Sequence, residues 1–186
     1  VLVPQPPLTI CDDNNDGFGV FDLTQVINPI LGGALEPVNV FFYETQTDAQ
    51  FGVNAIPLPA QYTNIVAQTQ IIYVGITSLT TGCLSVAPLT IIVHPRPQAT
   101  LPSDLAVCDD NFDGIGVFNL ALATPEVLGN INPNTHTVTY HLTQAQAQGG
   151  TNAISPVNSF SNTTANTQQI WVRVTTTATG CFDVVP

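Results

Sequence analysis

The chain contains one segment twice, and this internal repeat limits its fold more than any other feature. Residues 11–23 read Cys-Asp-Asp-Asn-Asn-Asp-Gly-Phe-Gly-Val-Phe-Asp-Leu, and residues 108–120 read Cys-Asp-Asp-Asn-Phe-Asp-Gly-Ile-Gly-Val-Phe-Asn-Leu, 97 positions later. The likeness continues to Thr-Gly-Cys at 81–83 and at 179–181, where the offset is 98. One residue is therefore inserted, and we place it in the loop at 148–150, where length changes cost little. Such self-similarity indicates two tandem copies of one module.

The junction between the two copies is rich in proline. We predict repeat 1 at 8–97 and repeat 2 at 98–186, with the boundary after His94-Pro-Arg-Pro97. Residues 1–7 look like the same strand-then-proline junction, so we expect them to be the end of a preceding repeat or a donor strand that completes a neighbouring subunit. Because Pro186 corresponds to Pro88, repeat 2 is expected to lack its final strand.

The composition favours strands over helices. Only 8% of the residues are charged, so the surface must consist of uncharged polar side chains, many of them β-branched. Apolar runs predict strands at 38–43, 70–77 and 85–93, a shorter strand at 19–23, and short helices at 24–31 and 124–128. The predicted fold class is all-β, with two tandem immunoglobulin-like Greek-key β-sandwich domains.

The net charge argues against nucleic acid as a partner, and the length of the apolar runs argues against membrane insertion. The net charge is −11, and Arg96 and Arg173 are the only strong cations. Nucleic acid is excluded because its phosphates need many Lys and Arg side chains. Membrane insertion is not expected either, because no uninterrupted apolar run reaches 18 residues.

The four cysteines occupy equivalent places in the two repeats. Cys11 and Cys108 precede the acidic segments, and Cys83 and Cys181 follow Thr-Gly. We predict one disulfide inside each repeat, Cys11 with Cys83 and Cys108 with Cys181, and pairing across the repeats remains open. Zinc is disfavoured because no closely spaced Cys pair or nearby His exists. Disulfides indicate an oxidising compartment.

The acidic segment after each first cysteine resembles the first half of a calcium loop. Oxygen side chains stand at alternating positions, and a glycine at the sixth position permits a sharp turn. No glutamate stands at the twelfth position, so the loop is not an EF-hand. A simple turn is the competing interpretation. We predict calcium ligands at Asp12, Asn14, Asp16, the Phe18 carbonyl and Asp22, and at Asp109, Asn111, Asp113 and the Ile115 carbonyl.

The sequence offers no catalytic constellation, and we predict that the protein is not an enzyme. His94, His136 and His141 have no counterparts in the other repeat, and we expect them to be solvated. Carbohydrate binding is the alternative function, because the aromatic faces of Tyr73 and Trp171 could stack on sugar rings. Such rings more often pack strands together.

The Cys-Asp-Asp-Asn-x-Asp-Gly-x-Gly-Val-Phe-x-Leu segment, followed by Ile-Tyr/Trp-Val and Thr-Gly-Cys, resembles repeats of very large surface proteins. These are the adhesin-like proteins that Bacteroidota, including flavobacterial and gliding species, export through the type IX secretion pathway. The resemblance implies tandem immunoglobulin-like modules at the bacterial cell surface or outside the cell. It also implies a role in adhesion or in filament formation.

Repetition, charge and resemblance together predict a structural or adhesive repeat of an extracellular surface adhesin or fibre. Calcium and one disulfide per repeat are expected to stabilise it. The expected partners are neighbouring copies of the same repeat or subunit, which strand donation could join head to tail. Surface glycans or other cells are further expected partners.

Overall fold

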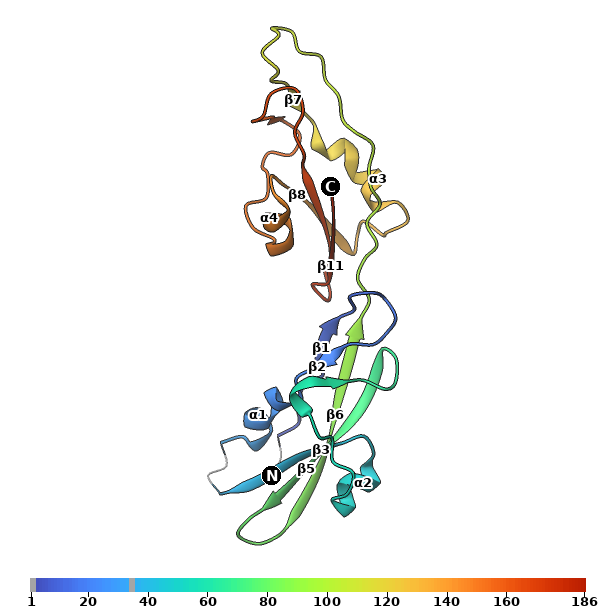
Figure 1. Ribbon diagram of the computed structural model, residues 1–186, viewed down its shortest axis with the longest axis vertical. Helices are drawn as coiled ribbons and strands as arrows, with labels where there is room; N and C mark the ends of the chain where they lie inside the picture. The colour runs from blue at the N-terminus through green and yellow to red at the C-terminus, as the bar shows by residue number, and fades with distance from the viewer. Residues whose placement is uncertain (1–2, 34–35) are drawn as a thin grey trace. The chain divides into compact units, whose positions relative to one another are not determined.

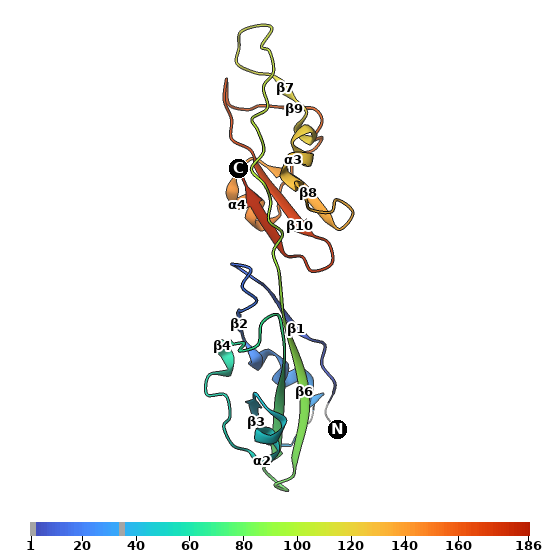
Figure 2. The same cartoon turned by 90° about the vertical axis from the view of Figure 1, so that its right-hand side faces the viewer.

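The chain forms two compact units, residues 1–95 and residues 96–186, which we call repeat 1 and repeat 2. The structure is a computed structural model that describes residues 3–33 and 36–186. Each unit has its own cluster of buried apolar side chains. Figures 1 and 2 show that β-strands make up most of the regular structure in both, with short helices beside them.

Repeat 1 is built on a four-stranded sheet with the strand order β1-β6-β5-β3. The strands are β1 (Leu8–Cys11), β3 (Val38–Tyr43), β5 (Thr69–Ser78) and β6 (Leu84–His94). The β3, β5 and β6 strands pair antiparallel, whereas β1 runs parallel to the end of β6, with Leu8 opposite Ile91 and Cys11 opposite His94. The strand β1 therefore fixes Cys11 at the C-terminal end of β6.

A second, smaller pair of strands and several short helices complete repeat 1. They are β2 (Val20–Phe21) paired with β4 (Tyr62–Thr63), η1 (Leu23–Val26), α1 (Ile27–Leu31), α2 (Gln46–Phe51) and η2 (Pro59–Gln61). Thr45 caps α2 by accepting a hydrogen bond from the Asp48 amide, and Gly52 ends the helix in the left-handed conformation. The local sequence thus sets both ends of this helix.

The core of repeat 1 lies between the sheet and the smaller elements. Ile72, Val74 and Ile76 alternate with more exposed or smaller residues along β5 and are at most 5% exposed. They pack with Phe21 and Phe42, which are each 1% exposed. Burying side chains of this size contributes about 2 kcal/mol each. The alternating apolar side chains that predicted this strand therefore also form part of the core.

Repeat 2 has the same order of elements with a shorter main sheet, β11-β10-β8. Its elements are β7 (Val117–Phe118), η3 (Leu120–Ala123), α3 (Thr124–Leu128), β8 (His136–His141), α4 (Gln144–Gly149), β9 (Phe160–Ser161), β10 (Trp171–Thr176) and β11 (Phe182–Val185). Residues 105–108, which correspond to β1, form no strand.

The prediction of two β-rich repeats is confirmed, since strands outweigh helices in both units. The strand β3 begins and ends where the apolar run predicted it, and α3 does so as well. Of the expected donor segment, residues 1–2 lie outside the described residues, and the Val3 amide donates to the Ile30 carbonyl of its own repeat. Strand donation remains a prediction. Among the described residues, no helix combines the length and the apolar character needed to cross a membrane.

Candidate functional site

The acidic loop of repeat 1 is organised around the side chain of Asp12. This residue follows β1, and its amide donates to the His94 carbonyl, which extends the β1–β6 pairing by one bond. Its carboxylate points back into the loop, where Oδ1 accepts from the Asn14 amide at 3.2 Å and Oδ2 accepts from the Gly17 amide at 2.6 Å. Only 3% of Asp12 is exposed. The carboxylate therefore holds the turn closed from inside.

The next two oxygen-bearing side chains of this loop face each other. Asn14 donates from Nδ2 to Asp16 Oδ2 at 2.7 Å, and Asp16 Oδ1 accepts from the Phe18 amide at 2.8 Å. Asn15 and Gly17 both have positive φ, 59° and 86°. Asparagine and glycine tolerate this conformation best, so the sequence suits a tight wrap of the chain.

A buried asparagine that the sequence analysis missed anchors the loop from the β4–β5 connection. Asn64 is 3% exposed, and its Oδ1 accepts from the Gly19 amide at 2.7 Å. Its Nδ2 donates to the carbonyls of Gly17 and Val66 at 2.9 and 2.8 Å. Every hydrogen-bonding position but one of this amide is thus used. Asn64 thus ties the C-terminal end of the acidic loop, at Gly17 and Gly19, to a segment nearly fifty residues further along the chain.

The acidic loop of repeat 2 repeats this arrangement. Asp109 Oδ2 accepts from the Gly114 amide at 2.7 Å, and Asn111 Nδ2 donates to Asp113 Oδ2 at 2.8 Å. Asn162 takes the part of Asn64, accepting from the Gly116 amide and donating to the carbonyls of Gly114 and Thr164. The signal for this residue was present in the sequence, because Thr63-Asn64 and Ser161-Asn162 are repeat equivalents.

Hydrogen bonds from backbone amides lower the pKa of both central carboxyl groups, Asp12 and Asp109. Burial raises the pKa of Asp12, but the backbone amides of Gly17 and its neighbours outweigh this effect and lower it below the usual value. For Asp109 the Gly114 amide is the largest cause, and its pKa is lowered as well. Amide hydrogen bonds favour the charged form of a carboxyl group. Both loops therefore carry negative charge that a cation could neutralise.

The predicted calcium ligands fall into two groups in the structure. Asp12, Asn14 and Asp16 lie together in one turn, as do Asp109, Asn111 and Asp113 in the other. Asp22 instead caps η1 by accepting from the Thr24 amide at 3.0 Å, and Asn119 does the same for η3. Phe18 and Ile115 follow the loops directly. Within the described part of the chain, no three His, Cys, Asp or Glu side chains gather as they would around a metal ion.

The cysteines do not pair as the sequence analysis predicted. Cys11 and Cys181 are disulfide-bonded, whereas Cys83 and Cys108 are free and exposed. Each expected pair, Cys11 with Cys83 and Cys108 with Cys181, therefore combines a bonded cysteine with a free one. The prediction of one disulfide inside each repeat is wrong.

The register of the sheet explains why repeat 1 cannot close its own bond. Cys11 stands opposite His94 at the end of β6, and Cys83 directly precedes Leu84 at its start. A strand rises about 3.3 Å per residue, so these ends are about 33 Å apart. The Cα atoms of a disulfide lie within about 7 Å of each other. Cys11 and Cys83 therefore mark opposite ends of the repeat.

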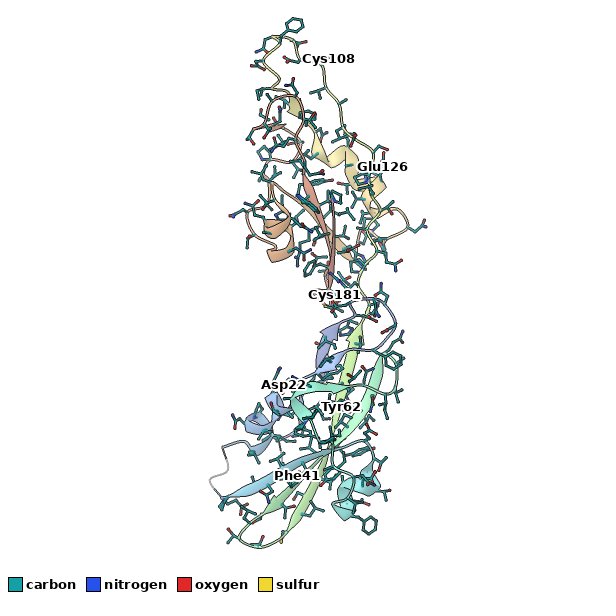
Figure 3. All side chains as sticks on the ribbon, viewed as in Figure 1. Asp22, Phe41, Tyr62, Cys108, Glu126 and Cys181 are labelled. Atoms are coloured by element: carbon teal, nitrogen blue, oxygen red, sulfur yellow. The ribbon has the colours of Figure 1, made fainter. Side chains whose placement is uncertain are left out.

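Repeat 2 separates its cysteines in the same way. Cys108 adjoins the acidic loop at one end, and Cys181 lies in the turn between β10 and β11 at the other, as Figure 3 shows. The Thr176 amide donates to the Cys181 carbonyl at 2.8 Å and closes that turn. Cys181 is fully buried, whereas Cys108 is exposed.

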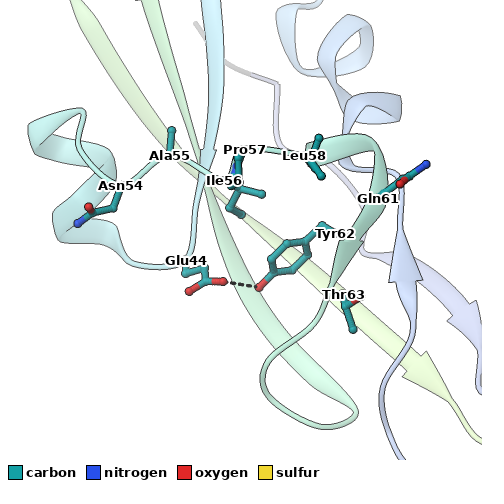
Figure 4. A pocket seen from close by; sticks show the side chains of 9 residues that line it. All are labelled: Glu44, Asn54, Ala55, Ile56, Pro57, Leu58, Gln61, Tyr62 and Thr63. Carbon is teal, nitrogen blue, oxygen red and sulfur yellow. Dashed lines mark hydrogen bonds between the residues drawn. The ribbon is translucent and has the colours of Figure 1, made fainter.

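A shallow hollow of about 330 Å³ in repeat 1 is bordered by Glu44 and Tyr62 (Figure 4). Tyr62 donates to Glu44 Oε1 at 3.2 Å and accepts from Gln70 Nε2 at 2.7 Å. Burial, the main cause, raises the pKa of Tyr62 to about 12, so its hydroxyl stays protonated at neutral pH. The repeat 2 equivalents of Glu44 and Tyr62 are His141 and Phe160, so the two modules do not share this pair.

The aromatic residues and histidines of the sequence analysis lie as follows. Tyr73 and Trp171 are half-buried on their strands β5 and β10, and glycan stacking on them remains a prediction. His141 was expected to be solvated, but it is 1% exposed. Its ring nitrogens contact Thr139 Oγ1 and the Thr151 carbonyl at 2.9 and 2.8 Å. A buried histidine satisfied in this way replaces the exposed Glu44 of repeat 1.

These features define a class of protein: a tandem array of small β-rich modules that carry an anchored acidic loop and a cysteine at each end. Both repeats match the family described as the Flavobacterium inter-domain disulphide bond domain, over residues 7–97 and 104–186, and the chain belongs to this family. The flavobacterial part of the predicted resemblance is thereby supported. No curated protein and no solved structure matches the chain.

Proposed function

We propose that this chain is an extracellular structural repeat whose two modules are tied covalently by a disulfide between Cys11 and Cys181. The bonding states of the four cysteines carry this proposal. Cys83 and Cys108 are free, so Cys11 and Cys181 have only each other as partners within the chain. The family description, which names an inter-domain disulphide, agrees with this pairing.

The covalent tie would replace intra-module bonds as the source of rigidity. Each repeat has its own buried core, and in each repeat one of the two cysteines is free. A bond between modules instead restricts how they move relative to one another, which suits a stalk or fibre at a cell surface. Such a bond persists in an oxidising compartment, so we place the protein outside the cell. An adhesive or filament-forming array remains the role we propose.

We also propose that each module is an immunoglobulin-like sandwich with fewer strands than the full fold. The order β6-β5-β3 corresponds to the G-F-C sheet of that fold, and β2-β4 corresponds to its B-E pair. In repeat 2 the same places are taken by β11-β10-β8 and β7-β9. The first strand, β1, adds to the free edge of β6.

Electrophoresis tests the covalent tie. The Cys83→Ser/Cys108→Ser double variant keeps only Cys11 and Cys181, and we expect a denatured monomer that migrates faster without reductant, because a closed loop is more compact. Reduction should remove the shift, and the Cys11→Ser variant should never show it. Disulfide-linked dimers of the double variant would mean that Cys11 and Cys181 bond between chains, and the proposal would fail.

For the acidic loops we propose calcium binding, with Asp12, Asn14 and Asp16 as ligands in repeat 1 and their equivalents in repeat 2. The support is the twofold occurrence of one turn that gathers ionised carboxylates in a chain of net charge −11. The carboxylate oxygens of Asp16 and Asp113 each accept a hydrogen bond from the loop, and a carboxylate oxygen with one such bond has a further lone pair for a hard cation. Calcium would supply positive charge there and nothing catalytic.

Thermal unfolding tests this proposal. Calcium at ten millimolar should raise the melting temperature by about 5–15 °C over chelator, since extracellular modules bind with dissociation constants of about 0.1 to 1 mM. The Asp16→Asn/Asp113→Asn variant should lose the shift while keeping the loop hydrogen bonds of Asp12 and Asp109. Equal melting temperatures of the native protein with calcium and with chelator would contradict calcium binding.

A further inference from the structure

The loop between β4 and β5 has the same backbone construction as its counterpart between β9 and β10. In repeat 1, Gln70 Oε1 accepts from the amides of Ile65 and Val66 at 2.8 and 3.1 Å. In repeat 2, Gln168 Oε1 accepts from the two amides at 163–164 at 2.6 and 3.2 Å. The module therefore holds this loop through its glutamine, whichever side chains the loop presents to solvent.

The side chains at these positions differ in character between the repeats. Ile65, Val66 and the nearby Ile71 of β5 are 60%, 53% and 47% exposed. Repeat 2 carries exposed polar residues at the equivalent positions, which are Thr163, Thr164 and Gln169. The same fold therefore forms without aliphatic side chains here. Because exposed clusters of large apolar residues mark interaction sites, these three residues of repeat 1 indicate a contact outside the module.

The three aliphatic side chains line one hollow of about 460 Å³, together with Tyr73 and Glu44. Glu44 also borders the hollow of Figure 4, so its side chain stands where the two hollows meet. Tyr62, which bonds Glu44, is replaced by Phe160 in repeat 2. The apolar rim and the tyrosine that holds the carboxylate are thus features of repeat 1 that repeat 2 does not share.

The carboxylate of Glu44 is held in place but is not neutralised within its own module. Tyr62 donates to Glu44 Oε1 at 3.2 Å, and Gln70 Nε2 donates to the Tyr62 hydroxyl at 2.7 Å, so the hydroxyl proton is directed at Glu44. The only two strong cations of the chain, Arg96 and Arg173, both belong to repeat 2. An oriented carboxylate beside aliphatic side chains favours a cation that also carries apolar surface.

We propose that the Glu44 surface, which comprises Glu44, Ile65, Val66, Ile71 and Tyr73, binds an arginine-bearing peptide segment of a partner protein. The guanidinium bonds the Glu44 carboxylate, and apolar residues beside the arginine cover the three aliphatic side chains. Arginine fits better than lysine because its planar guanidinium can donate to both carboxylate oxygens and is less strongly hydrated. Charge complementarity with a chain of net charge −11 also selects a basic partner.

NMR spectra of the full oxidised chain test this site, with the tripeptide acetyl-Leu-Arg-Leu-amide as the probe. At millimolar peptide we expect the backbone amide signals of Ile65, Val66 and Ile71 to shift. The same peptide with citrulline in place of arginine has nearly the same shape without the charge, and it should bind at least about tenfold more weakly. Glu44→Gln should remove this preference. Equal binding of the two peptides to the native protein, or no shift with either, would overturn the proposal.

A matched pair of variants tests the apolar rim. Ile65→Thr/Val66→Thr/Ile71→Gln introduces the residues of repeat 2, so it should keep the dispersed amide spectrum of a folded chain and lose the peptide. Leu79→Thr changes an exposed leucine just beyond the far end of β5 and should bind the peptide like the native protein. Binding that survives the triple change would contradict the proposed surface. If the triple variant does not fold, the Glu44→Gln comparison still decides.

Two other occupants of the Glu44 surface would give different results, and each would overturn the proposal. Shifts of the same amides by cellotetraose, with none by the arginine peptide, would make the surface a glycan site. Concentration-dependent association of the chain that the triple change abolishes, measured by sedimentation velocity, would make the occupant a second copy. We expect neither result.

Discussion

Pulling on the two ends of the oxidised chain is expected to extend little more than its terminal residues, whereas the reduced chain should lengthen by about 600 Å. The reason is the path of the force. A bond from Cys11 to Cys181 carries the load past the roughly 170 residues between them, and a residue in an extended chain spans about 3.5 Å. The residues between the two cysteines would then bear no tension, and the load would fall on residues 8–10 of β1 and on β11. Single-molecule force spectroscopy with enzymatically attached handles measures this length.

Two comparisons make the force experiment decisive. The Cys11→Ser variant should release the full length without reductant. Bonds inside each repeat would free only the segment between Cys83 and Cys108 in the oxidised chain, about 90 Å. An oxidised extension of that size would contradict the proposed tie, and so would an extension that reduction leaves unchanged.

Replacing Asn162 by alanine is expected to destabilise repeat 2 by about 3 kcal/mol. The variant removes three hydrogen bonds, one from the Gly116 amide and two to the carbonyls of Gly114 and Thr164, and each contributes about 1 kcal/mol net. Trp171 is the single tryptophan of the chain. Its fluorescence in a urea titration therefore reports the unfolding of repeat 2.

Matched variants isolate the effect of this amide. Asn64→Ala removes the equivalent amide from repeat 1 and, in the reduced protein, should leave the Trp171 transition unchanged because each repeat has its own core. Asn158→Ala changes an exposed asparagine of repeat 2 and should shift stability by less than about 0.5 kcal/mol. A loss below about 1 kcal/mol for Asn162→Ala would show that the amide does not anchor the acidic loop.

Much of the fold was predictable because local pattern decides it. The apolar alternation around Ile72 and Val74 predicted β5, and the run at 38–43 predicted β3. The helices α2 and α4 were missed, although Thr45 and Thr143 stand at their N-caps. Their polar sequences lack the apolar period on which the helix predictions relied, so the capping residues were the only signal.

The disulfides could not be predicted from spacing, because sequence separation does not give distance in a folded module. Cys11 and Cys83 looked like a pair since each repeat holds two cysteines. Their true separation depends on two facts that are not local: β6 is eleven residues long, and β1 lies parallel to its far end. The acidic loops were found, but their buried anchors Asn64 and Asn162 lie too far along the chain for a local motif to include them.

Peptide mapping of the unreduced protein tests the Cys11–Cys181 bond most directly. After the free thiols are alkylated in denaturant at mildly acidic pH, which suppresses exchange, a glutamyl endopeptidase cleaves after Glu44 and Glu126 and leaves Glu36, which precedes proline, uncut. The bond predicts that fragment 1–44 remains linked to fragment 127–186, while fragment 45–126 separates with Cys83 and Cys108 both alkylated. A single linked species of all three fragments without alkylated cysteine would contradict the account.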